Sequence, residues 1–235
     1  MSRPTFILLA AMLALATAGC GKSSKKAATT ASTSTSTQTT SSKPAAPSSG
    51  PCTSAKAKDK GQQHLAKPTA VLPRNKPATL ALITNCGEID IALDVKRAPR
   101  TASSVAYLVR KGFYDGLPFH RIAKLPTGGD FVIQGGDPTG TGNGGPGYSV
   151  HETPPANLRY TRGVVAMAKT EIQPSGTSGS QFFIVTAEDA GLPADYALVG
   201  KVTKGDDVLS KIAAVPTDST EHPTTPVVIE SAKIS

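Results

Sequence analysis

A single arginine, Arg121, interrupts an apolar stretch of the chain, FHRI at residues 119–122. A cation that alternates into an apolar sheet face needs a partner or a ligand, because an isolated buried charge is costly. The next apolar stretch, DFVIQGG, places Phe131 and Gln134 where they could occupy nearby strand faces. Together these side chains predict a small apolar hollow with hydrogen-bond donors at its rim. The alternative is that Arg121 points outward into solvent.

A second stretch, SQFFIVT at residues 180–186, places two adjacent phenylalanines after a run of Gly and Ser. Because successive side chains of a strand point to opposite faces, Phe182 and Phe183 should have different surroundings. One face would pack a core, and the other would line a site. Gln181, at the start of this strand, would then mark the edge of the site.

Other residues that match known motifs lack the context that those motifs need. GTGNGG at residues 140–145 satisfies the G-x-G-x-x-G pattern, but Pro138 precedes it and Pro146 follows it, where a strand and a helix are required. His120 has no partner at zinc-ligand spacing, and the chain has no G-x-S-x-G nucleophile motif. We therefore predict a site without a metal, a nucleotide or a covalent intermediate.

The segments that would position these residues follow from apolar alternation and turn residues. Residues 79–85 and 88–94 alternate around an Asn-Cys-Gly turn and predict a β-hairpin. Apolar residues at helical spacing behind Pro99 predict one helix, and Asp206 would cap a second short helix. Many short strands with few helices indicate an antiparallel barrel or sandwich. The remaining strands are expected at 119–122, 130–136, 163–169, 180–186, 197–203 and 225–234.

The chain begins like that of an exported protein. Arg3 precedes an apolar run, residues 6–16, that is too short for a transmembrane helix and fits a secretory signal. The run leads into TAGC, which resembles a bacterial lipoprotein signal with Cys20 as the lipidated residue. Residues 21–50 form a Ser/Thr/Ala-rich tract that predicts a disordered tether. The alternative is a plain secretory signal with an incidental cysteine.

Charge is distributed unevenly along the chain. Residues 1–78 hold 11 of the 25 Lys and Arg but one of the 17 acids, which leaves a net charge of +10, whereas residues 79–235 carry a net charge of −2. A nucleic-acid-binding domain usually presents a basic patch. The charge of the C-terminal part therefore argues against nucleic acid as a partner.

Two cysteines remain, Cys52 and Cys86. In an exported protein an even pair predicts a disulfide, which here would attach the linker, residues 51–78, to the folded domain. Closing a loop of that length is worth about 3–4 kcal/mol in the chain-entropy model. The alternative is two free thiols.

Taken in order, the apolar segments resemble the signatures of a cyclophilin-type peptidyl-prolyl isomerase. The resemblance covers residues 79–235 and rests on FHRI, DFVIQGGD, GVVAMAK, SGSQFFIVTA and LVGKV. It implies a mainly β fold, a closed eight-stranded antiparallel β-barrel capped by two α-helices. It also implies catalysis of cis–trans isomerisation at X-Pro bonds (EC 5.2.1.8) without a cofactor.

The resemblance also assigns roles to individual residues. Arg121 corresponds to the catalytic arginine of the family. Phe183 would face the proline pocket and Phe182 the core, so Phe183→Ala should mainly cost activity and Phe182→Ala mainly stability. The substrate-binding positions match His120, Phe131, Val132, Gln134, Ala168, Lys169, Gln181, Phe183, Leu192 and Tyr196.

Three positions depart from the residues usual in the family. Lys169 stands where Asn is frequent, Gly191 where many members carry Trp, and Tyr196 where many carry His. The missing Trp bears on cyclosporin binding more than on isomerase activity. Residues 123–129 are also longer than the usual link, so the entrance of the site would differ.

The combined expectation is a monomeric foldase that acts on proline-containing segments of exported polypeptides. A lipidated N-terminus would hold it at the extracytoplasmic face of the cell membrane; the alternative is a secreted soluble protein. A function of a different class is a proline-binding or chaperone-like module with little turnover, which Lys169 and Gly191 favour. The expected organisation is a signal peptide (1–20), a tether (21–50), a linker (51–78) and an isomerase domain (79–235).

Overall fold

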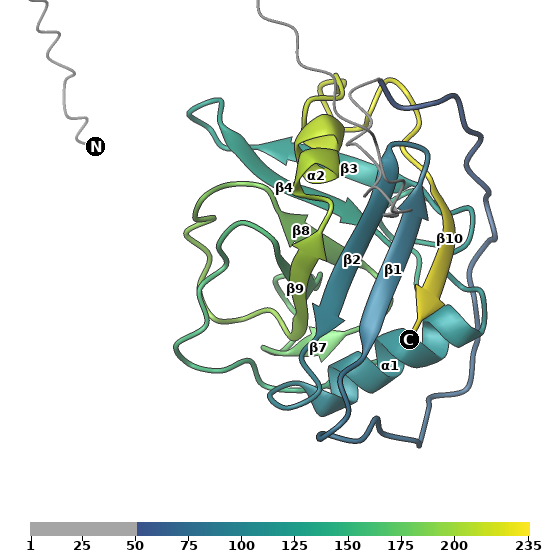
Figure 1. Ribbon diagram of the computed structural model, residues 1–235, viewed down its shortest axis with the longest axis vertical. Coiled ribbons are helices and arrows are strands. Elements are labelled where there is room, and N and C mark those ends of the chain that lie inside the picture. The colour runs from purple at the N-terminus through teal and green to yellow at the C-terminus, as the bar shows by residue number, and fades with distance from the viewer. Residues whose placement is uncertain (1–50) are drawn as a thin grey trace, which may run out of the picture. The chain divides into compact units, whose positions relative to one another are not determined.

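The computed structural model describes residues 51–235 (Figure 1). The signal peptide, Cys20 and the tether, all predicted within residues 1–50, lie outside the described residues. Between residues 51 and 235, no helix combines the length and the apolar composition needed to cross a membrane.

Eight antiparallel strands form one curled sheet (Figure 1), in the order β10-β1-β2-β9-β6-β8-β4-β3. Each of the predicted strands is present. Two further short strands, β5 (Val150–His151) and β7 (Thr177–Ser178), pair with each other outside this sheet, and no alternation in the sequence predicts them. The strands of the main sheet are β1 (Thr79–Thr84), β2 (Gly87–Leu93), β3 (Phe119–Lys124), β4 (Asp130–Gly135), β6 (Val164–Met167), β8 (Phe182–Val185), β9 (Leu198–Lys204) and β10 (Ile229–Ile234).

The predicted fold class is confirmed, and the sheet curls until its two edge strands, β3 and β10, approach each other. Backbone groups around the start of β3 bond to backbone groups around the start of β10. Phe119 N–H donates to Val227 O at 2.8 Å, and Ile229 N–H donates to Leu117 O at 2.9 Å. The sheet is therefore joined by a few backbone hydrogen bonds at this seam rather than by a continuous strand pair.

Two helices lie at opposite ends of the curled sheet (Figure 1). α1 spans Pro99–Arg110 and buries its apolar face, and α2 spans Asp206–Ala213 and packs against β2, β3 and β4. The prediction that Asp206 caps α2 is wrong, because Gly205, at φ 93°, is the N-cap and Asp206 is the first helical residue. A Cβ at Gly205 would collide with the backbone oxygen of Glu88, so only glycine fits this close approach.

Adjacent residues of the central strands pack into two different apolar clusters. The main core includes Ile133 and Phe182 and is shared with both helices. The outer cluster includes Val132 and Phe183, on the other side of the same strands. Because side chains alternate along a strand, β4 and β8 contribute to both clusters. Burial on both faces explains why these strands read as continuous apolar runs.

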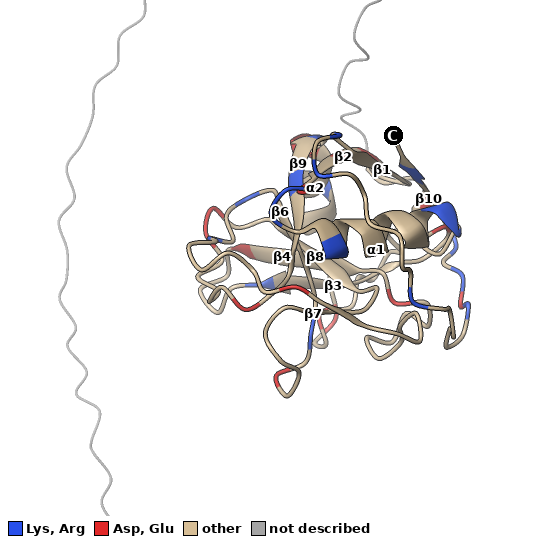
Figure 2. Cartoon of the chain, turned by 90° about the horizontal axis from the view of Figure 1, so that it is seen from below, with Lys and Arg blue, Asp and Glu red and all other residues tan. Residues whose placement is uncertain are grey.

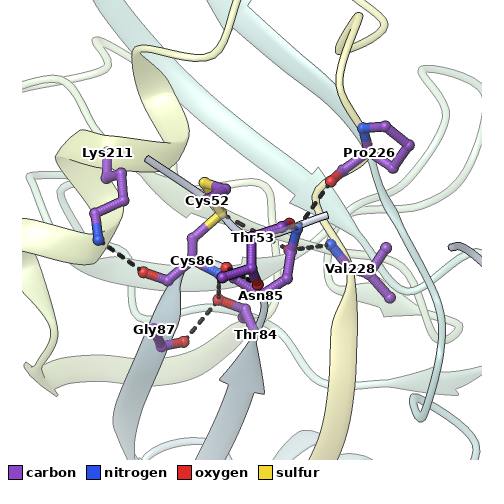
Figure 3. Close-up of a disulfide and its surroundings, with 9 residues drawn as sticks. All are labelled: Cys52, Thr53, Thr84, Asn85, Cys86, Gly87, Lys211, Pro226 and Val228. Atoms are coloured by element: carbon purple, nitrogen blue, oxygen red, sulfur yellow. Dashed lines mark hydrogen bonds between the residues drawn. A yellow bond between two sulfur atoms is a disulfide. The ribbon is translucent and has the colours of Figure 1, made fainter. Parts of the chain in front are cut away.

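The linker, residues 51–78, crosses the surface of the domain without helix or strand up to β1 and is fastened by a disulfide. Cys52 and Cys86 are bonded, as the sequence predicts (Figure 3). Beside the disulfide, Thr53 N–H donates to Asn85 O at 2.8 Å, and Asn85 Nδ2 donates to Thr53 O at 2.6 Å (Figure 3). The bond between the two sulfurs excludes the alternative of two free thiols in this structure.

Farther along, the linker bonds to loops that lead toward the pocket side of the domain. Lys60 N–H donates to Pro138 O at 2.8 Å, and Leu65 N–H donates to Pro146 O at 2.7 Å. The side chain of Leu65 also packs against the main core. The linker is therefore a packed part of the domain, although its sequence carries no periodic pattern.

Charged residues of both signs are interspersed over the domain (Figure 2). Several form surface pairs, such as Arg162 with Asp206 at 2.8 Å and Lys204 with Glu88 at 2.6 Å. Exposed pairs of this kind are worth about 0–1 kcal/mol each. They contribute little to stability, which rests on the two apolar clusters and the disulfide.

Candidate active site

A pocket of about 230 Å³ beside the outer cluster gathers most of the predicted site residues. A larger hollow of about 430 Å³ lies elsewhere on the domain, and another of about 540 Å³ adjoins the pocket. Size therefore does not single out the pocket, but its combination of aromatic walls and an arginine does. The lining residues are Arg121, Phe131, Val132, Gln134, Ala168, Lys169, Phe183, Leu192 and Tyr196.

Strand register brings together pocket residues that are far apart in the sequence. Arg121 of β3 pairs with Gln134 of β4, and Gln134 pairs with Phe183 of β8. Phe183 in turn pairs with Ala166 of β6. Residues in direct register across a sheet lie on the same face. The guanidinium, the amide and the aromatic ring are therefore neighbours because of the sheet order.

The apolar wall of the pocket rests on a group of aromatic rings. Phe183 meets Tyr196 edge to face, with ring centroids 5.3 Å apart. Tyr160 is fully buried, and its hydroxyl donates to Tyr196 O at 2.6 Å and accepts from Tyr196 N–H at 2.9 Å. Burial raises the pKa of Tyr160 to about 12, which keeps its hydroxyl proton in place as a donor. Sequence reasoning missed Tyr160, because its spacing from the pocket residues follows no pattern.

A chain of hydrogen bonds forms the polar side of the pocket. Arg121 Nη1 donates to Gln134 Oε1 at 3.3 Å, and Gln134 Nε2 donates to Gln181 Oε1 at 3.0 Å. Gln181 Nε2 then donates to the backbone oxygens of Gly142 and Gly144 at 2.8 and 2.9 Å. Gln181 does not line the pocket itself. It borders the adjacent hollow of about 540 Å³ and reaches the pocket through Gln134.

The other end of this chain is an acid that sequence reasoning missed. Glu221 lies in the loop between α2 and β10, and its Oε2 is 2.6 Å from Arg121 Nε. The Arg121 and Glu221 side chains are 37% and 38% exposed, so the pair lies at the rim. One hundred positions separate the two residues in the chain. No local motif signals such a contact.

The glycine-rich segment, residues 140–145, forms part of the wall of the adjacent hollow. Asp137 anchors it by accepting hydrogen bonds from Thr139 N–H at 2.8 Å and from Gly142 N–H at 2.5 Å. Burial opposes ionisation of Asp137, but these hydrogen bonds outweigh burial and lower the pKa of its carboxyl. The segment that matched a nucleotide pattern thus serves here to shape the groove beside the pocket.

Lys169 lines the pocket, but its ammonium group pairs with Asp195, which does not line the pocket. Its side chain is 5% exposed, and Nζ lies 2.6 Å from Asp195 Oδ2 and donates to Gln173 O at 3.2 Å. The ammonium also lies 5.5 Å from the centroid of the Tyr196 ring. The hydrogen bond from Lys169 lowers the pKa of Asp195. The ion pair therefore links the pocket wall at Lys169 to Asp195, the residue before Tyr196.

His120, predicted to contact substrate, does not line the pocket. It precedes Arg121 on β3, at an irregularity where Phe119 pairs with Gly135 and Arg121 with Gln134, so that His120 has no register partner of its own. The imidazole is buried, and neither ring nitrogen has a hydrogen-bond partner among the described residues. Burial lowers its pKa, although the Asp137 carboxylate opposes this shift. Contact between His120 and a bound peptide therefore stays a prediction.

The curled eight-stranded sheet with its two helices and small apolar pocket defines a cyclophilin-like β protein. The chain belongs to the family of cyclophilin-type peptidyl-prolyl cis-trans isomerases, whose family model matches residues 79–234. By homology its activity is peptidyl-prolyl cis–trans isomerisation (EC 5.2.1.8).

Individual relatives agree with this assignment. A peptidyl-prolyl cis-trans isomerase of Arabidopsis thaliana is 36% identical over 166 residues, which cover 69% of this chain and 96% of the relative. Peptidyl-prolyl cis-trans isomerase A of Mycobacterium tuberculosis is 38% identical over 176 residues, covering 67% and 92%. The crystal structure of a Cryptosporidium parvum cyclophilin-type isomerase, determined in the presence of the dipeptide Ala-Pro, is similar with a TM-score of 0.61 and 32% identity. The similarity covers 67% of this chain and 98% of that one.

Proposed function

We propose that this isomerase acts on X-Pro bonds of exported polypeptides, with Arg121 as its catalytic residue. The observation that supports this most directly is the position of the guanidinium at the rim of an apolar pocket of about 230 Å³. Its partners there, Gln134 and Glu221, bind Nη1 and Nε. Among the described residues no partner of Nη2 is present, so a donor remains for a substrate.

The barrier to the reaction is the partial double bond of the amide, about 18–20 kcal/mol. At the twisted transition state the resonance is lost, and the prolyl nitrogen gains an available lone pair. A donor aimed at that nitrogen stabilises the twisted state more than either planar state, which lowers the barrier. A guanidinium is always charged and has only donors, so Arg121 can perform this step without a proton transfer.

The apolar wall has a complementary task in this proposal. Phe131, Val132, Phe183 and Leu192 would hold the pyrrolidine ring, so that rotation takes place in the part of the peptide before the proline. Holding one side of the bond while the other rotates requires a rigid wall. The packing of Phe183 against the Tyr160–Tyr196 pair supplies that rigidity.

Action outside the cytoplasm is supported by the disulfide and by the sequence of the N-terminus. Structural disulfides persist in oxidising compartments, and Cys52–Cys86 joins the linker to the domain. The lipid anchor at Cys20 and the tether remain proposals, because they rest on sequence alone. The intact mass of the membrane-extracted protein tests them: a mature chain that begins at an unmodified residue would rule out lipidation.

A second candidate is a proline-binding module with weak turnover. The observation that favours it is the open space at Gly191, next to the pocket residue Leu192, where an added Cβ would meet no other atom within 4 Å. A protease-coupled peptide assay separates the two functions. A binder shifts the NMR signals of a proline peptide without accelerating cis–trans exchange, whereas an isomerase does both.

The decisive test of the proposed mechanism is the variant Arg121→Ala. Turnover of an Ala-Pro peptide should fall at least about tenfold, or roughly 1.4 kcal/mol in transition-state stabilisation. Glu88→Gln, which breaks a surface ion pair of the same length, is the matched control. Unchanged turnover in a folded Arg121→Ala protein would show that another residue acts on the amide.

A further inference from the structure

The loop after α2 holds a residue in an unusual backbone conformation next to the pocket. Glu221 has a φ of 65°, and among the described residues it is the only one other than glycine with a positive φ. A side chain is disfavoured in this left-handed region because its Cβ crowds the backbone. Such a conformation persists only when the surrounding structure imposes it, and it is found most often at functional sites.

The surrounding hydrogen bonds show how the conformation is imposed. Glu221 N–H donates to Asp218 O at 3.1 Å, and the Asp218 carboxylate accepts from His222 N–H at 3.1 Å. On its other side, Glu221 O accepts from Ile122 N–H of β3 at 2.9 Å. The loop is thus fastened to the strand that carries Arg121. This fastening fixes where the Glu221 carboxylate points.

The carboxylate meets the guanidinium at a different nitrogen from the one that Gln134 binds. Glu221 Oε2 binds Nε at 2.6 Å, whereas Gln134 Oε1 accepts from Nη1 at 3.3 Å. Two contacts on different nitrogens define the plane of a guanidinium, and a single contact would allow it to rotate. The side chain of Arg121 is otherwise long, flexible and partly exposed, so without Glu221 it would sample many rotamers.

We propose that Glu221 is the positioning residue of the catalytic arginine. It holds Nε so that the free edge of the Arg121 guanidinium faces the pocket before a peptide binds. The strained backbone at Glu221 is then the cost of placing a carboxylate at this point. The proposal rests on the catalytic role of Arg121 stated above, and it adds a residue that no motif of the sequence contains.

Two variants of the full-length protein test the proposal. Glu221→Gln removes the charge and keeps the size, and Glu221→Gly removes the carboxylate while relieving the backbone. Both should lower kcat for an Ala-Pro peptide about tenfold with little change in KM, because misplacing a catalytic group raises the barrier more than it weakens binding. Glu221→Gly should lower kcat without lowering the thermal midpoint of unfolding. If Glu221 had only a structural role, kcat would fall only together with the thermal midpoint.

Two control variants and one spectroscopic signal accompany these measurements. Ser219→Gly adds the same backbone freedom to the same exposed loop without touching Arg121, and Glu88→Gln removes an equally short surface ion pair. Both should keep wild-type turnover. The Nε–H signal of Arg121 in an NMR spectrum should shift in Glu221→Gln and stay in place in both controls.

The outcomes separate this proposal from the one on which it rests. If Arg121→Ala lowers turnover at least about tenfold and both Glu221 variants keep wild-type turnover, Glu221 is only a surface ion-pair partner and the proposal is overturned. If Glu221→Gln raises turnover, the carboxylate restrains the arginine from reaching substrate, and the proposal is likewise overturned. If Arg121→Ala keeps wild-type turnover, the assignment of Arg121 as the catalytic residue is wrong, and the role proposed for Glu221 is overturned with it. If Glu221 acts through Arg121, the double variant Arg121→Ala/Glu221→Gln should have the same turnover as Arg121→Ala alone.

Discussion

Phe182 and Phe183 are adjacent, chemically identical and almost equally buried, at 4% and 5% exposure, yet they belong to different parts of the molecule. Phe182 packs edge to face against Tyr114 and Phe119 in the main core. Phe183 packs against Tyr160 and Tyr196 in the outer cluster, where it also lines the pocket. Burial alone therefore does not distinguish a ring that packs the main core from a ring that lines the pocket, whereas the face of the strand does.

The two regions also differ in what surrounds them. The main core is closed by both helices and by the seam near β3 and β10, and the linker adds Leu65 and Leu72 to it. The outer cluster is smaller and ends at the rim formed by Arg121 and Gln134. Both regions contribute to stability by burying apolar side chains, but only the outer cluster also forms a wall of the pocket. Variants that act on one region at a time can test this division.

The largest effect is expected from Phe182→Ala. Removing a buried ring from the main core should cost about 3–5 kcal/mol in the free energy of unfolding. Tyr114 and Phe119 would then face a cavity in place of the ring against which they pack. Urea unfolding measures this cost, and turnover at a temperature where the variant is folded should remain close to wild type. A variant with wild-type stability would show that the main core does not depend on this ring.

Removal of the disulfide should have a slightly smaller effect. The double variant Cys52→Ala/Cys86→Ala loses a cross-link over 34 residues of chain, which is worth about 3–4 kcal/mol. Wild-type protein unfolded in a strong reductant is the matched control and should give the same free energy of unfolding. Because Cys86 packs in the main core, turnover of the folded variant should not change. A tenfold loss of turnover would mean that the linker shapes the pocket.

The pocket side of the comparison is tested by Phe183→Leu. Because Phe183 is as buried as Phe182, Phe183→Ala would cost stability as well as activity, and leucine keeps most of the volume. We expect a stability loss below about 1.5 kcal/mol. We also expect turnover to fall about tenfold, or 1.4 kcal/mol, since the flat wall for the pyrrolidine ring is lost. Phe182→Leu is the matched control. If it loses more turnover than Phe183→Leu, the two faces of β8 are assigned the wrong way round.

The smallest effect is a pH dependence of stability that arises from His120. Its pKa in the fold is lowered by burial, below the unfolded value of about 6.5. As pH falls below 6.5, the unfolded chain binds a proton that the folded chain does not, so stability decreases toward the folded pKa. His120→Asn should flatten the curve of unfolding free energy between pH 7.5 and 5.5, because the variant has no imidazole that takes up a proton on unfolding. If His120→Asn leaves the pH dependence of the unfolding free energy unchanged, the pKa of His120 is not lowered in the folded protein.

Much of this protein was predictable from local pattern. Alternation and turn residues predicted the strands of the main sheet and both helices, with the cap of α2 misplaced by one residue. The pocket residues followed from the order of family signatures along residues 79–235. The two short strands β5 and β7 escaped prediction, because a pair of residues is too short to show a period.

Features encoded within a few residues can be predicted from the chain alone: the strands, the alternation that separates Phe182 from Phe183, and the pairing of the two cysteines available in the linker and domain. The long-range neighbours that complete the site become visible only in the folded protein. Tyr160 under the aromatic wall and Glu221 beside Arg121 are brought there by strand order and by a loop far along the chain. The physical reason is that strand period and turn chemistry are local, whereas a contact across 100 residues depends on how the whole sheet curls.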